Sequence, residues 1–250
     1  MQATLPHLVP GGASISPQKT DPRQKLIIAL DVSTAAAAQK IVLAVGDSGL
    51  TYKVGMQLYT AEGPQVVRDL VASGRRVFLD LKYHDIPNTV ASAVQEAAQL
   101  GVSMLTVHAS GAGKMLRAAT EAARAAETDL VVLGVTVLTS LGEQDLQDVG
   151  VHGTVLDEVK RLATLAKASG CQGVVSSARE VRDLRSEMGY EFVIVTPGVR
   201  PAGKGHEDQV RVVTPAEAIA AGASHIVVGR PITAAADPAA EARAILAEIS

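Results

Sequence analysis

The segment 77–89, VFLDLKYHDIPNT, crowds charged residues at the end of an apolar run that has the pattern of a buried strand. Charged groups are tolerated in an apolar setting mainly when they are paired or used in chemistry. Side chains alternate across a strand, so Phe78, Asp80 and Lys82 are expected on one face and the aliphatic residues between them on the other. An acid and a base on the inner face of a sheet predict proton-transfer chemistry.

The carboxylates around Lys82 indicate whether this lysine acts as a proton donor or as a nucleophile that forms a Schiff base. Asp80 and Asp85 favour its ammonium form, whereas a lysine that forms a Schiff base must first lose its proton. The two carboxylates could instead hold Mg²⁺, but an ammonium between them competes for the same space and neutralises the same charge. A buried structural ion pair is the remaining alternative. Asp31 and Lys53, expected at similar height on neighbouring strands, favour a proton donor over such a pair.

The chain around this segment alternates short apolar runs with longer Ala-rich stretches. The apolar runs predict strands at 26–31, 50–55, 77–82, 103–108, 130–139, 173–177, 192–198 and 225–230. The stretches between them predict helices at Thr34–Val45, Pro64–Ala72, Val90–Leu100, Lys114–Ala126, Thr154–Ala168, Ala178–Glu187, Pro215–Ala221 and Pro238–Ile249. Strands that are apolar on both sides predict a parallel sheet. Eight strand–helix units favour a single (β/α)8 TIM barrel, of the α/β class, over an open doubly wound sheet.

Length and composition limit the class of protein. No linker divides residues 25–250, so we expect one barrel domain there, preceded by a flexible N-terminal tail at residues 1–24. A net charge of −3 gives no long-range field for nucleic acid or a membrane surface, and no apolar run approaches the roughly 20 residues of a membrane span. A single cysteine, Cys171, excludes an intrachain disulfide and indicates a reducing compartment, so we expect a cytoplasmic protein.

Nearly every predicted strand delivers a polar group at its C-terminal end, where the catalytic residues of such barrels lie. These groups are Asp31, Lys53, Asp80 with Lys82, His108, Thr139 with Ser140, Ser176 with Ser177, the 197–200 segment and Gly229 with Arg230. Core packing alone does not produce that pattern. The pattern therefore predicts one site at this end of the barrel.

The loops after the seventh and eighth strands have the composition of a phosphate site. They supply Arg200, Gln209 in the stretch AGKGHEDQ (202–209), and Arg230 after Gly229, where backbone N–H groups can approach an anion. A lone Gly-Arg is often only a turn, but a second arginine favours phosphate binding. The segment SGAGK (110–114) lacks the spacing of a phosphate loop and predicts the start of a helix instead. The histidines show no paired metal-ligand spacing, so no metal site is expected.

Several ordered motifs carry a resemblance to a known family. DLKYHDIPNT (80–89) matches the signature D-x-K-x-x-D-I-x-x-T, and this chain resembles the orotidine 5′-phosphate decarboxylase family, most closely its bacterial branch. The likeness covers essentially residues 25–250. Its other segments are ALDV (29–32), TYKVG (51–55), TVHASG (106–111), TVLTS (136–140), VTPGVR (195–200), DQ (208–209) and VVGRPIT (227–233).

The resemblance implies a (β/α)8 homodimer that converts orotidine 5′-phosphate to UMP and CO₂, the last step of de novo pyrimidine nucleotide synthesis. It implies no metal and no organic cofactor. By the same resemblance, Lys82 protonates C6 of the pyrimidine as CO₂ leaves, and Asp80 lies beside the substrate carboxylate. Asp31 and Lys53 contact the ribose hydroxyls and complete a charged array with these two residues.

The resemblance also implies a site shared between two subunits. Asp85 joins Lys82, Asp80 and Lys53 as a catalytic residue, and it reaches the partner subunit's site together with Ile86 and Thr89. The other substrate-binding positions, at the base and around the phosphate, are Thr139, Ser140, Pro197, Arg200, Gln209, Gly229 and Arg230.

Two other functions stay open from the residues. A Mg²⁺-dependent sugar-phosphate decarboxylase or hexulose-phosphate synthase of the same barrel group uses a similar D-x-K-x-x-D motif, although the IPNT, TPGVR and DQ segments argue against it. A barrel that binds a phosphate ligand without chemistry is the second alternative.

Overall fold

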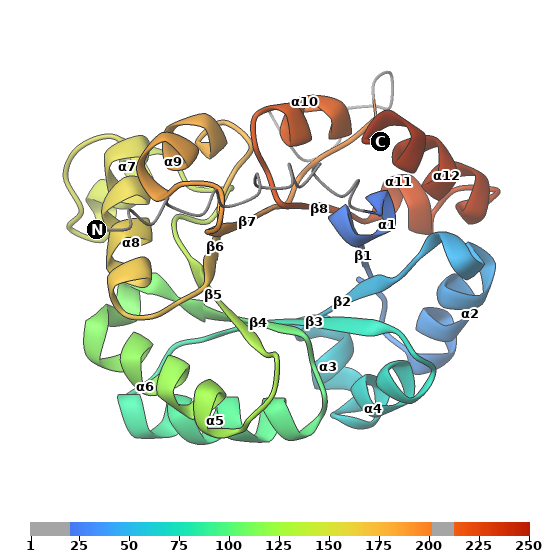
Figure 1. The fold of residues 1–250 in the computed structure, drawn as a ribbon, viewed down its shortest axis with the longest axis horizontal. Helices are drawn as coiled ribbons and strands as arrows, with labels where there is room; N and C mark the ends of the chain where they lie inside the picture. Colours follow the sequence, from blue (N-terminus) through green and yellow to red (C-terminus); the bar gives the residue numbers. More distant parts are fainter. Residues whose placement is uncertain (1–20, 202–212) are drawn as a thin grey trace, which may run out of the picture.

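Eight parallel strands close into a barrel in the computed structural model, which describes residues 21–201 and 213–250. Each strand pairs with the next along the chain, and the eighth pairs with the first. Figure 1 shows the ring of strands with the helices outside it. The strands are β1 Leu26–Ala29, β2 Thr51–Gly55, β3 Arg76–Tyr83, β4 Met104–His108, β5 Val131–Val135, β6 Gly173–Val175, β7 Val193–Thr196 and β8 His225–Val228. The predicted TIM barrel is confirmed.

All eight predicted helices are present in the ring around the barrel. They are α2 Ala35–Val45, α4 Gln65–Ala72, α5 Pro87–Gln99, α6 Ala112–Ala125, α8 Val155–Ala168, α9 Val181–Met188, α10 Pro215–Ala220 and α12 Pro238–Glu248. The sequence did not predict the short elements α1 Pro22–Lys25, α3 Met56–Glu62, α7 Glu143–Asp148, α11 Arg230–Thr233, η1 Gly46–Ser48 and η2 Ala109–Gly111. These last elements are too short for apolar periodicity to reveal them.

Capping side chains fix several helix starts. Thr34, Thr214 and Asp237 each accept a hydrogen bond from a backbone N–H in the first turn of the helix that follows. Helix α5 begins at Pro87, earlier than Val90, because proline is favoured in the first turn and its missing N–H needs no partner there.

Five of the predicted strands run too far at their C-terminal ends, whereas β2 and β4 end as predicted and β3 continues one residue further, to Tyr83. The fifth was expected to reach Thr139, but β5 ends at Val135, and β8 ends two residues before Arg230. Apolar alternation continues past the point where the backbone leaves the ladder, so the pattern alone cannot place the end of a strand. The polar residues at these positions therefore lie beyond the strands, Thr139 after β5 and Arg230 at the start of α11.

The two faces of the strands pack into two different apolar cores. Val77 and Leu79 belong to the outer core between the strands and the helices, whereas Phe78 belongs to the inner core, as the alternation predicts. The inner core fills the barrel axis with Ile27, Ala29, Phe78, Met104, Leu133, Val195 and Val227. It forms the floor beneath the charged residues at the barrel mouth.

The N-terminal boundary of the barrel lies slightly earlier than expected. The sequence assigned residues 1–24 to a tail, but α1 starts at Pro22 and Asp21 caps it. The carbonyl oxygen of Gln24 lies 2.8 Å from Nδ1 of His225 on β8, so this short helix is seated against the barrel. Residues 1–20 are outside the described part of the chain. Within the described part, no helix combines the length and apolar character that a membrane crossing requires.

Candidate active site

Four charged side chains of alternating sign meet at the mouth of the barrel. Lys53 Nζ lies 2.8 Å from Asp31 Oδ1 and 3.7 Å from Asp80 Oδ2, and Lys82 Nζ lies 2.8 Å from Asp80 Oδ1. Asp80 is therefore held between two ammonium groups, one on each carboxylate oxygen. Its side chain is 14% exposed, whereas Asp31 at the end of the row is 60% exposed. The expected grouping of these four residues is confirmed, and it is more than one isolated ion pair.

Gly55 makes room for this charged array. It is the last residue of β2 and pairs in register with Asp80 on β3. A Cβ atom at Gly55 would lie 3.0 Å from Lys53 Nζ and 3.5 Å from Asp31 Oδ1. Lys53 starts one layer lower, beside Phe78, and its ammonium group occupies the space that a side chain at position 55 would take.

The backbone of β3 departs from regular strand geometry at Lys82. Its φ angle is +53°, a conformation that is costly for a residue with a side chain. The register between β3 and β4 shifts in the same place, from Leu79 opposite Leu105 to Tyr83 opposite Val107. Strict alternation therefore fails here, and the bulge directs the Lys82 side chain back to Asp80.

Two histidines lie beside the array. The rings of His84 and His108 have centroids 5.4 Å apart, and His108 ends β4. Burial lowers the pKa of His108 from its ordinary 6.5; His84 and Lys82 lower it further, and Asp80 opposes them. The imidazole of His108 is thus biased toward its neutral form. No group of three or more potential metal ligands occurs among residues 21–201 and 213–250.

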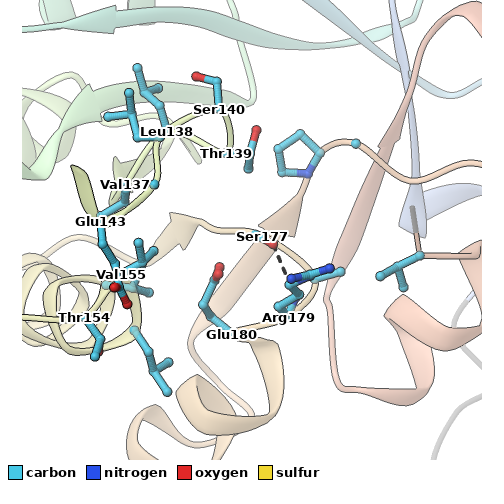
Figure 2. Close-up of a pocket in the computed structure, with 18 residues that line it drawn as sticks. Val137, Leu138, Thr139, Ser140, Glu143, Thr154, Val155, Ser177, Arg179 and Glu180 are labelled. Atoms are coloured by element: carbon cyan, nitrogen blue, oxygen red, sulfur yellow. Dashed lines mark hydrogen bonds between the residues drawn. The ribbon is translucent and has the colours of Figure 1, made fainter. Parts of the chain in front are cut away.

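A cavity of ≈ 880 Å³ opens over the ends of β5, β6 and β7. Thr139 and Ser140 line it from the loop after β5, and Pro197 lines it from the loop after β7. Figure 2 shows Thr139 and Ser140 across the cavity from Glu180. Burial raises the pKa of Glu180, although the Ser176 hydroxyl donates a 2.9 Å hydrogen bond to its carboxylate and opposes the rise.

Among the predicted phosphate residues, Gly229 and Arg230 follow the end of β8, and Arg200 follows β7. Gly229 caps α11 and Arg230 starts it, while the Arg200 backbone N–H donates to the Val213 carbonyl at 3.1 Å. A Cβ atom at Gly229 would lie 3.8 Å from Asp31 Oδ2, so this end of β8 adjoins the charged array. Gln209 lies outside the described residues.

Asp85, Ile86 and Thr89 lie apart from the array within one chain. All three are exposed at the start of α5, and Ile86 retains 66% of its accessible surface. The Asp85 carboxylate accepts a 2.6 Å hydrogen bond from the Ile86 N–H. In the described part of the chain, Asp85 joins none of the ion pairs of the array.

Sequence reasoning missed two residues that shape the site. Gly55 ends a predicted strand, and glycine inside a strand signals a close approach. Thr106 lies two residues before His108 on β4, and its hydroxyl contacts both Asp80 and Lys82. Period-two alternation from His108 could have placed Thr106 on the inner face. The positive φ of Lys82 has no such signal, because it arises from the pairing of β3 with β4.

The fold and the site define a barrel enzyme with a charged acid–base array at the C-terminal ends of its strands, beside an open cavity. Residues 24–245 match the Orotidine 5'-phosphate decarboxylase / HUMPS family, and the chain belongs to that family.

Named relatives cover nearly the whole chain. An orotidine 5'-phosphate decarboxylase of Moorella thermoacetica is 52% identical, over 91% of this chain and 92% of its own. One from Hydrogenovibrio crunogenus is 48% identical, over 93% of this chain and 98% of its own. The crystal structure of orotidine 5'-phosphate decarboxylase from Lactobacillus acidophilus superposes with a TM-score of 0.82 at 38% identity, over 91% of this chain and 99% of that one.

We expect the free energy of unfolding to fall as the pH drops below about 6.5, partly because of His108. Its pKa is lower in the folded chain than in the unfolded chain, so the unfolded chain takes up the proton first. This contribution is complete above pH 6.5 and is lost as the pH falls from 6.5 toward the lower folded-state pKa. Urea unfolding from about pH 8 to about pH 5 measures it.

The His108→Gln variant should show a shallower loss of stability over this range. Part of the loss should persist, because burial also lowers the pKa of His225. His152→Gln, at an exposed position, is the matched control and should follow the parent chain. An equal loss in the His108→Gln and parent proteins would contradict the assignment.

Proposed function

We propose that this chain decarboxylates orotidine 5′-phosphate to UMP and CO₂ without a metal or organic cofactor, as the last step of de novo pyrimidine nucleotide synthesis in the cytoplasm. The observation that carries the proposal is the array in which Asp80 lies between Lys53 and Lys82. Relatives named as orotidine 5'-phosphate decarboxylases, about half identical over more than 90% of the chain, support this substrate over a sugar phosphate.

The chemical step needs a positively charged group next to C6 of the pyrimidine. When the C6–CO₂ bond breaks, its electron pair stays on C6 in an orbital in the plane of the ring, where the ring π system cannot delocalise it. The Lys82 ammonium stabilises this carbanion more than it stabilises the substrate, which accelerates the step. Lys82 then transfers a proton to C6, CO₂ departs, and the neutral amine recovers its proton from solvent.

Asp80 and the other charged residues support the ammonium. The Asp80 carboxylate, 2.8 Å from Lys82 Nζ, pairs with the ammonium group and holds it in place. Asp80 also lies beside the substrate carboxylate, while Asp31 and Lys53 bind the ribose hydroxyls. Nothing in this step calls for an electron sink, because the fixed charges are already oriented before the bond breaks.

The remaining residues bind the substrate at its two ends. Thr139, Ser140 and Pro197 line the cavity over β5 to β7, which accommodates the pyrimidine side. Arg200, Gln209, Gly229 and Arg230 bind the phosphate. Contacts at the phosphate are remote from C6, so their binding energy orients the ring and excludes water from the site.

A spectrophotometric decarboxylation assay on orotidine 5′-phosphate with EDTA tests the proposal. We expect full activity in the presence of the chelator. Activity that disappears with EDTA and returns with Mg²⁺ would favour the metal-dependent sugar-phosphate enzymes of the same family. Stabilisation by UMP without consumption of orotidine 5′-phosphate would instead identify a binding protein.

The Lys82→Ala variant should lose turnover and keep nucleotide binding. The proton donor is removed, whereas the contacts to the base and the phosphate stay in place. Single-turnover kinetics and UMP titration measure the two properties separately. Lys40→Ala, on the exposed face of α2, is the matched control and should keep the parent kcat. A near-normal kcat in Lys82→Ala would rule out the proton-donor role.

We also propose a homodimer with shared sites, in which Asp85, Ile86 and Thr89 reach the partner's site; their exposure within one chain supports this assignment. Mixing Lys82→Ala chains with Asp85→Ala chains should therefore restore activity. In the hybrid dimer one site carries both substitutions and the other carries neither, so an equal mixture should reach about one quarter of the parent activity. Subunit exchange verified by mass spectrometry without any recovery would contradict a shared site.

A further inference from the structure

Thr106 occupies an unusual place opposite the bulge of β3. Leu79 pairs with Leu105 and Tyr83 pairs with Val107, so three residues of β3 (80, 81 and 82) face the single residue Thr106. The regular ladder cannot continue across this mismatch, and the Lys82 backbone N–H needs another acceptor. Thr106 is completely buried, at 0% exposure, on the inner face of β4 between Met104 and His108.

One hydroxyl group provides that acceptor and also holds Asp80. The Lys82 backbone N–H donates to Thr106 Oγ1 at 2.9 Å, and Thr106 Oγ1 donates to Asp80 Oδ1 at 3.1 Å. A threonine hydroxyl has one proton, so the bond received from Lys82 directs that proton toward the carboxylate. The Lys82 ammonium donates to the same Oδ1 at 2.8 Å. The three bonds close a ring through the Lys82 backbone, Thr106, Asp80 and the Lys82 side chain.

This ring couples the strained backbone to the position of the reactive group. A positive φ at a non-glycine residue persists only where surrounding contacts hold it. Thr106 is the side chain that bonds the Lys82 backbone N–H, and it also fixes the oxygen against which the ammonium rests. Without the hydroxyl, both the direction of the Lys82 side chain and the rotation of the Asp80 carboxylate lose a constraint.

We propose that Thr106 is a positioning residue for the decarboxylation: its hydroxyl holds the Lys82 backbone in the left-handed conformation and the Asp80 carboxylate in register, and so aims the ammonium at the reacting carbon. The expected effect on kcat rests on the proposed function. The expected effect on the positions of Lys82 and Asp80 rests only on the three hydrogen bonds. Thr106 acts through the two charged residues, and no contact with the substrate is assigned to it.

Thr106→Val and Thr106→Ser separate the hydroxyl from the volume of the side chain. Valine keeps the shape and removes the hydroxyl, whereas serine keeps the hydroxyl. We expect kcat of Thr106→Val to fall roughly 10²-fold, the loss typical of a reactive group misplaced by about 1 Å, with KM and UMP affinity nearly unchanged. Thr106→Ser should recover most of kcat.

Thr120→Val is the control for a purely structural effect. Thr120 is also buried, and its hydroxyl bonds the Ser169 carbonyl at 2.9 Å on the outside of the barrel. This variant should lower the melting temperature while leaving kcat unchanged. Equal kcat losses in Thr120→Val and Thr106→Val, or a near-parent kcat in Thr106→Val, would overturn the positioning role.

Crystal structures of the ligand-free variants test, without an activity measurement, whether Thr106 holds the Lys82 backbone and the Asp80 carboxylate. In Thr106→Val we expect the Lys82 φ to return to negative values or Lys82 Nζ to leave Asp80 Oδ1, and in Thr106→Ser neither change. An unaltered Lys82 and Asp80 in the valine variant would refute the inference even if the parent chain proved inactive on orotidine 5′-phosphate. A parent chain without this activity would refute the proposed function separately.

Discussion

The pairing of Asp80 with two ammonium groups is the constraint around which the barrel mouth is built. A carboxylate that is 14% exposed is costly unless its charge is compensated, and here Lys53 and Lys82 approach its two oxygens from neighbouring positions. The same pairing fixes the positions of both ammonium groups beside the carboxylate. Structure and proposed chemistry therefore depend on one arrangement, because the charge that stabilises Asp80 is the charge that a carbanion needs.

The barrel leaves enough space at its mouth for the four charged side chains. The apolar layer of the barrel axis has a single aromatic ring, Phe78, and ends below the charges. Above it, Gly55 leaves the space into which the Lys53 ammonium rises toward Asp31. A closed parallel sheet brings the C-terminal ends of all its strands to one rim, so groups distant in the sequence reach one another without a long loop.

The bulge in β3 shows how a local irregularity serves the site. In a strictly alternating strand Asp80 and Lys82 would lie about 7 Å apart at Cα, with parallel side chains. The left-handed turn at Lys82 and the hydroxyl of Thr106 instead bring the ammonium onto the carboxylate. Strained backbone persists at a functional site when surrounding contacts hold it, and here Thr106 on β4 accepts the hydrogen bond of the Lys82 backbone N–H.

The sequence predicted the order of the eight strands and the eight longer helices, the inner and outer faces of β3 and the four charged residues of the array. Each depends on local information: period-two alternation, capping residues such as Thr34, and the rule that polar groups gather at one end of a parallel barrel. It also predicted Thr139 and Ser140, which line the cavity, although it placed Thr139 on a strand. These features can be predicted because the alternation of apolar and polar residues and of strands and helices recurs along the chain.

The way these parts meet depends on contacts between distant strands. The end of β5, the space at Gly55 and the opposition of Thr106 to three residues of β3 depend on pairing between strands that are distant in sequence. The positive φ of Lys82 follows from that register and from a buried hydroxyl, and no local propensity favours it. Residue types indicate which side chains take part in the site. The distances between them are fixed by the closure of the barrel, because strand pairing and packing set them rather than the neighbours of each residue along the chain.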